Sequence, residues 1–240
     1  MTALLKAEGL SKQFGGLKAV DAVDLEVGEG EILGVIGPNG AGKTTLFSLL
    51  AGSVAPSAGR ILLDGKPLRG PACKVVHAGV VRTHQIVRPF LNLTVFDNVA
   101  AAAQFGARRH GADARKFAAD LVHLVGLGAR AQEFPGTLTL SGRKRLELAR
   151  ALATEPRVLL LDEVIAGVDP AEAQALTRLV REVRETRKLS ILMIEHVMPA
   201  LMSLSDRVLV LDSGRKIAQG TPAEVAHDPR VIECYLGHKP

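Results

Sequence analysis

The sequence predicts an α/β fold with a parallel sheet at its centre and an inserted helical region. Three continuous apolar runs in the second half of the chain support this prediction, at 158–161, 190–194 and 208–211. Such runs are typical of strands that helices cover on both faces. The amphipathic segment 170–188 lies between two of these runs and has the length of a crossover helix. From 94 to about 153 the pattern is helical, without obvious strands.

The first part of the chain predicts further strands. Residues 19–27 alternate between apolar and acidic side chains, as a half-buried antiparallel strand does. Residues 59–65 resemble a strand that is closed by a turn, and the apolar run 75–81 suggests one more strand. The sequence has no internal repeat and no low-complexity linker, so we expect one α/β core.

The composition argues against several classes of protein. Hydrophobic residues make up 47% of the 240 residues, which is enough for a substantial core and argues against disorder. Tryptophan is absent and there is one tyrosine, which argues against stacking platforms for single-stranded nucleic acid. The formal charge of +5 suits an anionic ligand or membrane surface, and equally a soluble protein with a basic surface.

Cysteine content and the N-terminus bear on location. Cys73 and Cys234, the two cysteines, lack metal-like spacing, so we expect reduced thiols in a cytosolic protein. Residues 1–8 lack the long apolar stretch of a signal peptide, and no apolar run approaches the length that spans a bilayer. We therefore expect a soluble chain that reaches a membrane only through a partner.

A phosphate-binding loop follows the predicted strand 31–36. It reads Gly37-Pro38-Asn39-Gly40-Ala41-Gly42-Lys43-Thr44-Thr45, and a helical pattern continues from it to Ala51. The glycines let backbone N–H groups turn towards phosphate oxygens, and the helix N-terminus adds its positive dipole end. Lys43 can reach the β- and γ-phosphates, and the Thr44 hydroxyl can ligate Mg²⁺. A plain glycine-rich turn would not require Lys-Thr at the helix start, so this phosphate loop (37–45) predicts binding of a nucleoside triphosphate.

Two carboxylates end the apolar run 158–161. Asp162 and Glu163 would lie at the carboxyl edge of the sheet, where ligands bind in open α/β folds. Asp162 would hold Mg²⁺, commonly through water, and Glu163 would accept a proton from the attacking water. A helix N-cap with a neighbouring acid is the alternative, but the phosphate loop in the same chain favours an ATP site.

Two further polar residues could complete this site. His196 follows the predicted strand 190–194 and could hydrogen-bond the γ-phosphate and orient the water, although a histidine in this place is more often a cap or a surface residue. Gln85, in the string 82–85, could complete the coordination of Mg²⁺ or water, but by itself it indicates little.

Taken together, these residues resemble an ATP-binding cassette (ABC) transporter ATPase subunit over essentially the whole chain. The resemblance implies a P-loop NTPase (RecA-like) core with an antiparallel β subdomain and an inserted α-helical subdomain. In a single ABC ATPase domain, 1–87 and 153–240 would form the β subdomain and core, and 88–152 the helical subdomain. The implied function is hydrolysis of ATP, with Mg²⁺, to energise a membrane transporter.

The resemblance also assigns roles to individual residues. Gln85 becomes the Q-loop glutamine, 166–169 the D-loop and His196 the switch histidine. Phe14 falls where the family places an aromatic ring that stacks on adenine, which adds affinity more than selectivity. Val164 stands where proline usually follows the carboxylates, and we expect only a modest effect on loop stiffness.

Finer strings resemble the importers of branched-chain amino acids, a subfamily that also serves amides and urea. These strings are 14–20, 82–85, 194–198 and 231–237. An exporter ATPase for lipid or lipopolysaccharide is an alternative, because it shares nearly every catalytic residue. A non-transport cassette protein of translation or DNA repair usually has a second cassette or a long coiled-coil insertion, and the sequence has neither. A regulatory nucleotide sensor is a further alternative, but the catalytic residues favour turnover.

The family signature Leu-Ser-Gly-Gly-Gln is altered in this chain. In the family its leucine lies seven residues before the arginine that corresponds to Arg145, so the signature segment is Leu138-Thr139-Leu140-Ser141-Gly142. Side chains at Leu140 and Ser141 hinder close approach of the backbone to phosphate and resist positive φ. We expect this segment to clamp a partner's ATP poorly, or in an altered geometry through Thr139, Ser141 and Gly142. The alternative is that the family tolerates such substitutions with full function.

The resemblance finally implies partners. An intact phosphate loop beside an altered signature favours a heterodimer with a homologous ATPase subunit, although a homodimer stays open. The segment 86–98 would meet an integral membrane permease at the cytoplasmic face of the inner membrane, and an external solute-binding protein would act indirectly. The basic runs 143–145 and 181–188 are interpreted as solvated helix faces, and not as a nucleic-acid surface.

Overall fold

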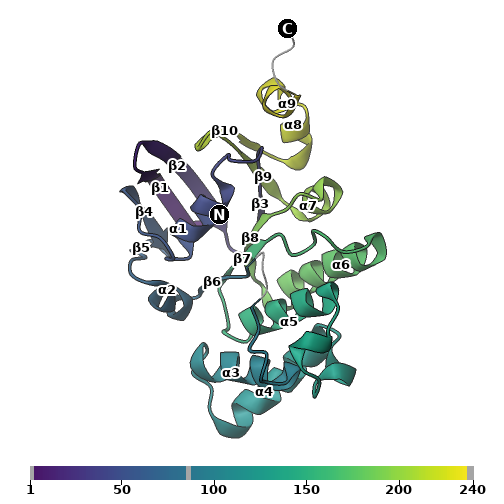
Figure 1. Cartoon of the computed structure of the whole chain (residues 1–240). Helices are drawn as coiled ribbons and strands as arrows, with labels where there is room; N and C mark the ends of the chain where they lie inside the picture. Colours follow the sequence, from purple (N-terminus) through teal and green to yellow (C-terminus); the bar gives the residue numbers. More distant parts are fainter. Residues whose placement is uncertain (1–2, 85–87, 237–240) are drawn as a thin grey trace.

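The computed structural model describes residues 3–84 and 88–236, which form two sheets and surrounding helices (Figure 1). The larger sheet has the strand order β10-β9-β3-β8-β7-β6. Its strands are β3 (Ile32–Ile36), β6 (Val80–Arg82), β7 (Val158–Asp162), β8 (Ser190–Ile194), β9 (Arg207–Asp212) and β10 (Arg215–Gly220). The neighbours from β9 to β6 are parallel, and β10 pairs antiparallel with β9. The predicted parallel sheet is confirmed.

The N-terminal part of the chain forms a second, antiparallel sheet. Its strand order is β2-β1-β4-β5, with β1 (Ala3–Phe14), β2 (Leu17–Gly28), β4 (Ala58–Leu63) and β5 (Lys66–Pro67). Helix α1 (Lys43–Leu50) packs between the two sheets, because its buried side chains share one apolar cluster with residues of both. The predicted strands at 19–27 and 59–65 are confirmed.

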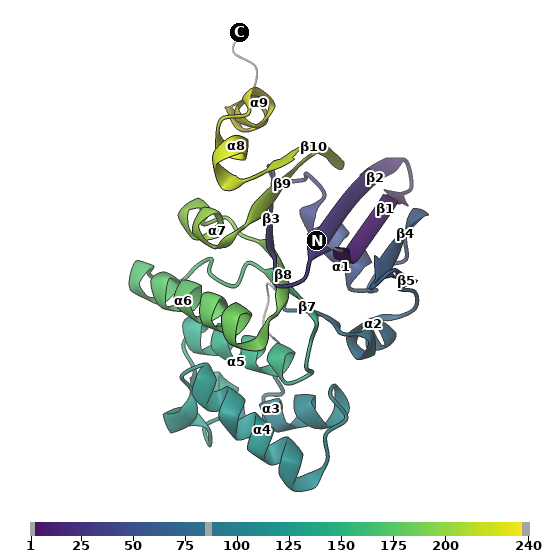
Figure 2. The ribbon, with the colours of Figure 1, turned by 180° about the vertical axis from the view of Figure 1, so that it is seen from behind.

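Helices α5 (Leu140–Leu152), α6 (Pro170–Arg187) and α7 (Met198–Leu204) lie on the other side of the parallel sheet, as Figure 2 shows from behind. Helices α3 (Val95–Phe105) and α4 (Gly111–Leu124) lie farther from the sheet and pack on α5, with short 3-10 turns η1 (Gly128–Arg130) and η2 (Pro135–Thr137) before α5. They share a second apolar cluster with β7 and β8. After β10, the chain forms α8 (Pro222–Ala226) and α9 (Pro229–Leu236). The helical region expected from 94 to about 153 is confirmed.

The strand predicted at 75–81 is wrong for most of its length. Helix α2 (Ala72–Ala78) covers the first part, and Gly79 ends this helix with φ 102. The extended residues are Val80–Arg82 alone. A short apolar run does not distinguish a strand from a helix segment by periodicity, and here the run is shared between one of each.

The strand order places several loops at one edge of the parallel sheet. β3, β8, β7 and β6 are consecutive and parallel, so their carboxyl ends meet there. The phosphate loop follows β3, Glu163 follows β7 and His196 follows β8 closely. Residues that are far apart in the sequence are therefore brought to a single site.

Candidate active site

The phosphate loop requires glycine at two positions, because a side chain there would clash with neighbouring backbone. Gly37 and Gly42 have φ 153 and 98, which L side chains rarely adopt. A Cβ at Gly37 would lie 2.1 Å from the carbonyl oxygen of Leu211, and a Cβ at Gly42 would lie 2.3 Å from that of Ala19. The loop is thus packed against β9 and β2 while it leads directly into α1.

Lys43, the first residue of α1, closes this loop. Its Nζ donates hydrogen bonds to the carbonyl oxygens of Gly37 at 2.6 Å and Pro38 at 2.9 Å. Burial lowers the pKa of Lys43, and the charge of the Glu163 carboxylate raises it by less. The predicted phosphate ligand and the predicted base are therefore within electrostatic reach of each other.

Asp162 is buried at the end of β7 and forms an ion pair that the sequence did not indicate. Nη2 of Arg82 lies 2.6 Å from Oδ2 of Asp162, and Nη1 of Arg82 donates to the hydroxyl of Ser48 at 2.9 Å. The backbone N–H of Asp162 donates to the hydroxyl of Thr83 at 3.1 Å. Arg82 thus links the end of β6 to Asp162 and to α1.

Glu163 and His196 are in direct contact. Nε2 of His196 lies 2.8 Å from Oε1 of Glu163. The backbone N–H of Glu163 donates to the carbonyl oxygen of Ile194 at 2.9 Å, and Glu163 has φ 53, an uncommon value for a residue with a side chain. The sequence predicted that both residues belong to one site, and the structure brings their side chains together.

The oxygen donors at this edge fit Mg²⁺. Mg²⁺ prefers carboxylate and hydroxyl oxygens and commonly takes further oxygens from phosphates and water. The guanidinium of Arg82 bridges the Asp162 carboxylate and the hydroxyl of Ser48. Ser48 lies one helical turn after Thr44 on α1. Asp162 and Thr44 are therefore suited to hold the ion. Gln85, the third predicted ligand, lies outside the described residues.

Phe14 ends β1 and keeps an accessible ring. Its side chain is half-exposed, and the Nζ of Lys12 lies 5.0 Å from the ring centroid. The role of this exposed ring in stacking on adenine stays a prediction.

The signature segment adopts ordinary helical geometry. The Thr139 hydroxyl accepts the N–H of Gly142 at 3.2 Å and so caps α5. The expectation that positive φ matters here is wrong, because Leu140 and Ser141 form the first turn of α5 and neither has a positive φ. Ser141 is buried, and its hydroxyl donates to Oε2 of Glu172 on α6 at 2.6 Å.

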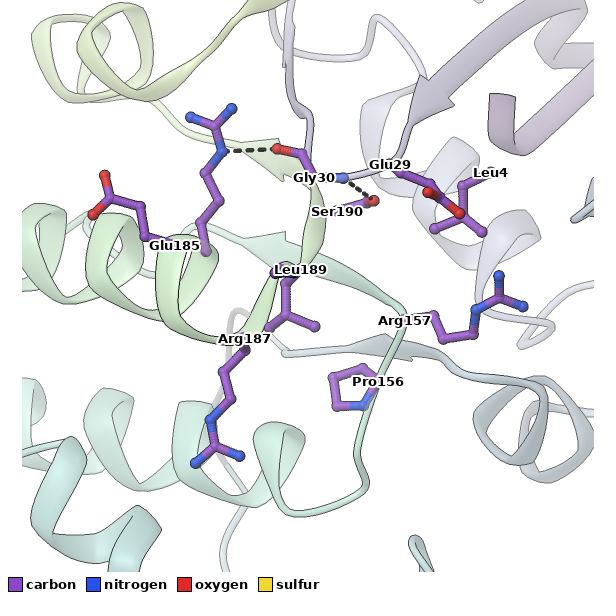
Figure 3. A pocket seen from close by; sticks show the side chains of 11 residues that line it. Leu4, Glu29, Gly30, Pro156, Arg157, Glu185, Arg187, Leu189 and Ser190 are labelled. Atoms are coloured by element: carbon purple, nitrogen blue, oxygen red, sulfur yellow. Dashed lines mark hydrogen bonds between the residues drawn. The ribbon is translucent and has the colours of Figure 1, made fainter. Parts of the chain in front are cut away.

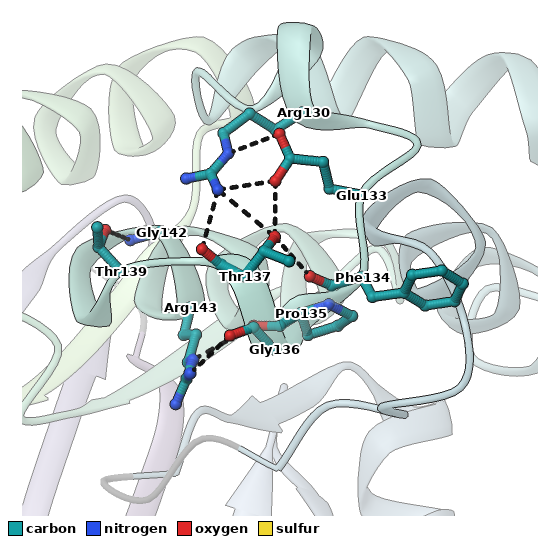
Figure 4. A network of polar contacts seen from close by, with 9 residues as sticks. All are labelled: Arg130, Glu133, Phe134, Pro135, Gly136, Thr137, Thr139, Gly142 and Arg143. Atoms are coloured by element: carbon teal, nitrogen blue, oxygen red, sulfur yellow. Dashed lines mark hydrogen bonds and ion pairs between the residues drawn. The ribbon is translucent and has the colours of Figure 1, made fainter.

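The approach to α5 is held by a polar network (Figure 4). The guanidinium of Arg130 donates to both oxygens of Glu133, at 3.0 and 2.7 Å, and the Thr137 hydroxyl donates to Glu133 at 2.6 Å. The hydrogen bond from Arg130 lowers the pKa of Glu133 to about 2. These contacts fix the turn that leads into the signature segment.

The basic run 143–145 is not the solvated helix face that its sequence suggested. Arg143 is exposed, but Lys144 is buried and Arg145 is partly buried. Burial lowers the pKa of Lys144. Arg145 reaches Oε2 of Glu172 at 3.1 Å. The three residues differ in solvent exposure because successive side chains of a helix point in different directions, so that Lys144 faces inwards.

The C-terminal helix α9 also reaches the phosphate loop. Burial raises the pKa of the Tyr235 phenol, and a hydrogen bond with the backbone of Gly37 opposes this by less. Tyr235 was noticed in the sequence only as part of a family-like string, because nothing local links a C-terminal tyrosine to the phosphate loop.

A pocket of about 560 Å³ lies at the opposite edge of the parallel sheet (Figure 3). It is lined by residues that precede β3, β7 and β8, among them Gly30, Pro156 and Leu189. Its Arg184 donates to the carbonyl oxygen of Gly30 at 2.8 Å. Ligands of parallel α/β sheets bind at the carboxyl edge, so this pocket is separate from the candidate site.

Comparison with protein families agrees with this arrangement. Residues 20–166 match the family described as ABC transporter, and residues 215–239 match the one described as branched-chain amino acid ATP-binding cassette transporter. In the described parts of the chain, no helix has the length and apolar character needed to cross a membrane.

Three relatives span almost the whole chain. The high-affinity branched-chain amino acid transport ATP-binding proteins BraF of Pseudomonas aeruginosa and LivG of Escherichia coli K12 are each 40% identical over 98% of this chain and 98% of their own. The lipopolysaccharide export system ATP-binding protein LptB of Haemophilus influenzae is 33% identical over 99% of this chain and 98% of its own.

Solved structures show the same fold. The ADP conformation of MJ1267, an ATP-binding cassette of an ABC transporter, is 28% identical and has a TM-score of 0.88 over 99% of this chain and all of the other. The dimeric ATP-binding cassette MJ0796, bound to ADP and phosphate, is 21% identical with a TM-score of 0.82, over 91% of this chain and 98% of the other, and supports the fold alone.

Proposed function

The chain belongs to the ABC transporter family, and from this premise we propose that it is the ATP-hydrolysing subunit of an importer of branched-chain amino acids or related small solutes. The observation that carries the solute class is the similarity to BraF and LivG over nearly the full length, together with the match at 215–239. The similarity to LptB is lower, at 33%, and lipopolysaccharide export is therefore the weaker alternative.

The site supports in-line attack of water on the γ-phosphate. Lys43 and the loop N–H groups would bind the β- and γ-phosphates, and Thr44 and Asp162 would hold Mg²⁺, which neutralises phosphate charge. Glu163 would take the proton from the attacking water as the bond between the γ-phosphorus and the bridging oxygen breaks, which leaves ADP and phosphate. His196, 2.8 Å from Glu163, would orient this base.

A second ATPase subunit would complete the site. In this proposal the signature segment faces the ATP of a partner subunit, and the partner's signature faces the phosphate loop of this chain. Because the hydroxyl of Ser141 is engaged with Glu172 and Leu140 is half-exposed, the signature segment offers few polar groups to a partner's ATP. This supports a heterodimer with a homologous subunit over a homodimer.

The permease would dock on the segment that follows the Q-loop. The side chains of Phe90, Leu91 and Leu93 are exposed, at 55%, 64% and 36%. Buried Asn98 holds their backbone, since its amide donates to the carbonyl oxygens of Phe90 at 3.0 Å and Leu93 at 3.1 Å. An apolar surface on a fixed backbone suits helices of a permease at the cytoplasmic face of the membrane, with a solute-binding protein on the other side.

The test uses the transporter complex that co-purifies with this chain from its source. We expect ATP hydrolysis and leucine uptake into proteoliposomes, and we expect Glu163→Gln to stop both while ATP remains bound. Hydrolysis that is unchanged in Glu163→Gln would refute the assignment of the base. Leucine uptake by a full complex in which every copy of this chain carries Glu163→Gln would refute the coupling of uptake to ATP hydrolysis by this chain.

A further inference from the structure

Lys144 is a buried lysine that contacts the loop of the catalytic glutamate. It lies on α5, two residues after the signature segment, and only 5% of its surface is exposed. Its Nζ donates to the carbonyl oxygen of Glu163 at 2.7 Å and to that of Ala166. Both acceptors belong to residues 163–166, which we call the Glu163 loop.

Glu195 holds the same loop from the other side. It lies between β8 and His196, and 1% of its surface is exposed. Its Oε1 accepts the backbone N–H of Ile165 at 2.6 Å, and its Oε2 has no hydrogen-bond partner among the described residues. Lys144 is the cation that acts on this buried carboxylate, and Glu163 and Asp162 are the anions.

The arrangement of Lys144 is costly for a residue with a purely structural role. An ammonium group loses favourable hydration when it is buried, and an apolar side chain of similar length would avoid that loss. The neighbouring Arg143 shows the ordinary alternative, because it stays exposed and donates to the carbonyl oxygens of Pro135 and Gly136 (Figure 4).

We propose that Lys144 is a positioning residue that fixes the Glu163 loop to the helix carrying the signature segment. The inference rests on the proposed function, in which the signature segment contacts the ATP of the partner subunit. A helix moves as a rigid unit, so a displacement of Thr139–Gly142 by the partner's ATP displaces the ammonium of Lys144 and with it the backbone of Glu163. Lys144 thus ties the geometry of the catalytic base in one subunit to the ATP bound by the other.

The test compares four variants in the full transporter complex. Lys144→Met removes the two hydrogen bonds and keeps an unbranched side chain, and Lys144→Arg keeps a cation. The double variant Lys144→Met/Glu195→Gln removes both buried charges, which guards against misfolding caused by an unpaired carboxylate. Arg143→Met is the matched control, because it removes an adjacent cation that also donates to two backbone carbonyls.

Amide hydrogen exchange gives a readout that does not depend on activity. We expect faster exchange of the amides of Glu163 and Ile165 in Lys144→Met and in the double variant, but not in Arg143→Met. If exchange is unchanged in Lys144→Met and in the double variant, Lys144 does not anchor the Glu163 loop and the proposal is overturned. This result stands even if the wild-type complex fails to hydrolyse ATP, an outcome that would instead refute the proposed function.

Steady-state kinetics separates positioning from folding. We expect kcat of Lys144→Met to fall by about 10- to 100-fold, because small displacements of a catalytic group have effects of this size, while the affinity for ATP is retained. Lys144→Arg should recover most of the rate. Equal loss of ATP affinity and kcat, or an unchanged kcat in the double variant, would overturn the proposal.

Discussion

The phosphate loop and the signature segment are both expected to contact ATP, yet they are held in place by different means. The phosphate loop depends on its backbone, because Gly37 and Gly42 have positive φ and no room for a Cβ. The signature segment depends on side chains, since Thr139 caps α5 and Ser141 donates to Glu172. A departure from the family pattern therefore has different consequences in the two regions.

In the phosphate loop a side chain added at Gly37 or Gly42 would collide with the backbone of a neighbouring strand. In the signature segment Leu140 and Ser141 fit an ordinary first helical turn, so their cost is not backbone strain. What has changed is the surface that the segment presents, with an apolar side chain facing outwards and a hydroxyl facing inwards. The two regions can be tested separately by substitutions of decreasing expected effect.

Gly37→Ala is expected to have the largest effect. A Cβ here would lie 2.1 Å from a backbone oxygen of β9, so we expect loss of ATP binding and a fall of about 5 kcal/mol in the free energy of unfolding. Gly40→Ala is the control, because its Cβ would meet nothing within 4 Å and only its positive φ costs about 1 kcal/mol. Urea unfolding and nucleotide titration measure both. Equal losses of stability and of ATP binding in the two variants would show that close packing of the loop backbone at Gly37 is not what holds the phosphate loop in place.

Arg82→Met tests a side chain that links α1, the helix that follows the phosphate loop, to Asp162. Arg82 and Asp162 are 9% and 4% exposed, so the variant leaves a buried carboxylate unpaired. We expect the free energy of unfolding to fall by about 3 kcal/mol. The double variant Arg82→Met/Asp162→Leu should recover part of this loss in chemical denaturation. A double variant no more stable than the single one would show that the ion pair is not the cause.

The pH dependence of stability tests the buried Glu195 beneath the Glu163 loop. Burial raises the pKa of Glu195 to about 7, from the ordinary value of 4.5. The folded state therefore holds this proton more tightly than the unfolded chain, and its contribution to stability is lost as the pH rises through about 7.

We expect the wild type to lose about 2 kcal/mol relative to Glu195→Gln between about pH 5 and pH 8. Thermal unfolding at a series of pH values measures the difference. Parallel stability curves for the two proteins would contradict a protonated Glu195 in the folded state.

Ser141→Ala is expected to have the smallest effect, because Glu172 keeps its contact with Arg145. The loss of one hydrogen bond should lower the free energy of unfolding by about 1 kcal/mol and leave hydrolysis unchanged. Ser141→Gly is the informative companion, since it restores close backbone approach at a cost of about 1 kcal/mol in helix propensity. Faster hydrolysis in the complex with Ser141→Gly would show that the altered signature limits turnover. Loss of hydrolysis in Ser141→Ala would show that the hydroxyl contacts ATP.

Much of the fold could be predicted because its signals are local. The runs at 158–161 and 190–194 are apolar throughout, as strands buried on both faces must be, and the phosphate loop is contiguous. The run at 75–81 failed because its few residues are shared between a helix and a strand. The boundaries of the helical subdomain at 88–152 and the role of Gln85 stay predictions.

The unforeseen contacts that shape the site join residues distant in the sequence. Arg82 and Asp162 are 80 residues apart, and Lys144 and Glu163 are 19 apart. Arg82 was visible only as part of a family-like string, and Lys144 looked like a member of a solvated basic run. Whether a cation is exposed or buried depends on which elements pack against it, and this information is not present in the local pattern.

By itself, the sequence determined most of the elements and indicated the chemistry of the site, because a phosphate loop acts through its own backbone and two carboxylates follow one another at the end of a strand. The tertiary structure alone decided which charges meet. The strand order places β6 beside β7 and β8 beside β7, so that Arg82 reaches Asp162 and His196 reaches Glu163. The packing of α5 then turns Lys144 towards the Glu163 loop, because only one side of a packed helix can face solvent.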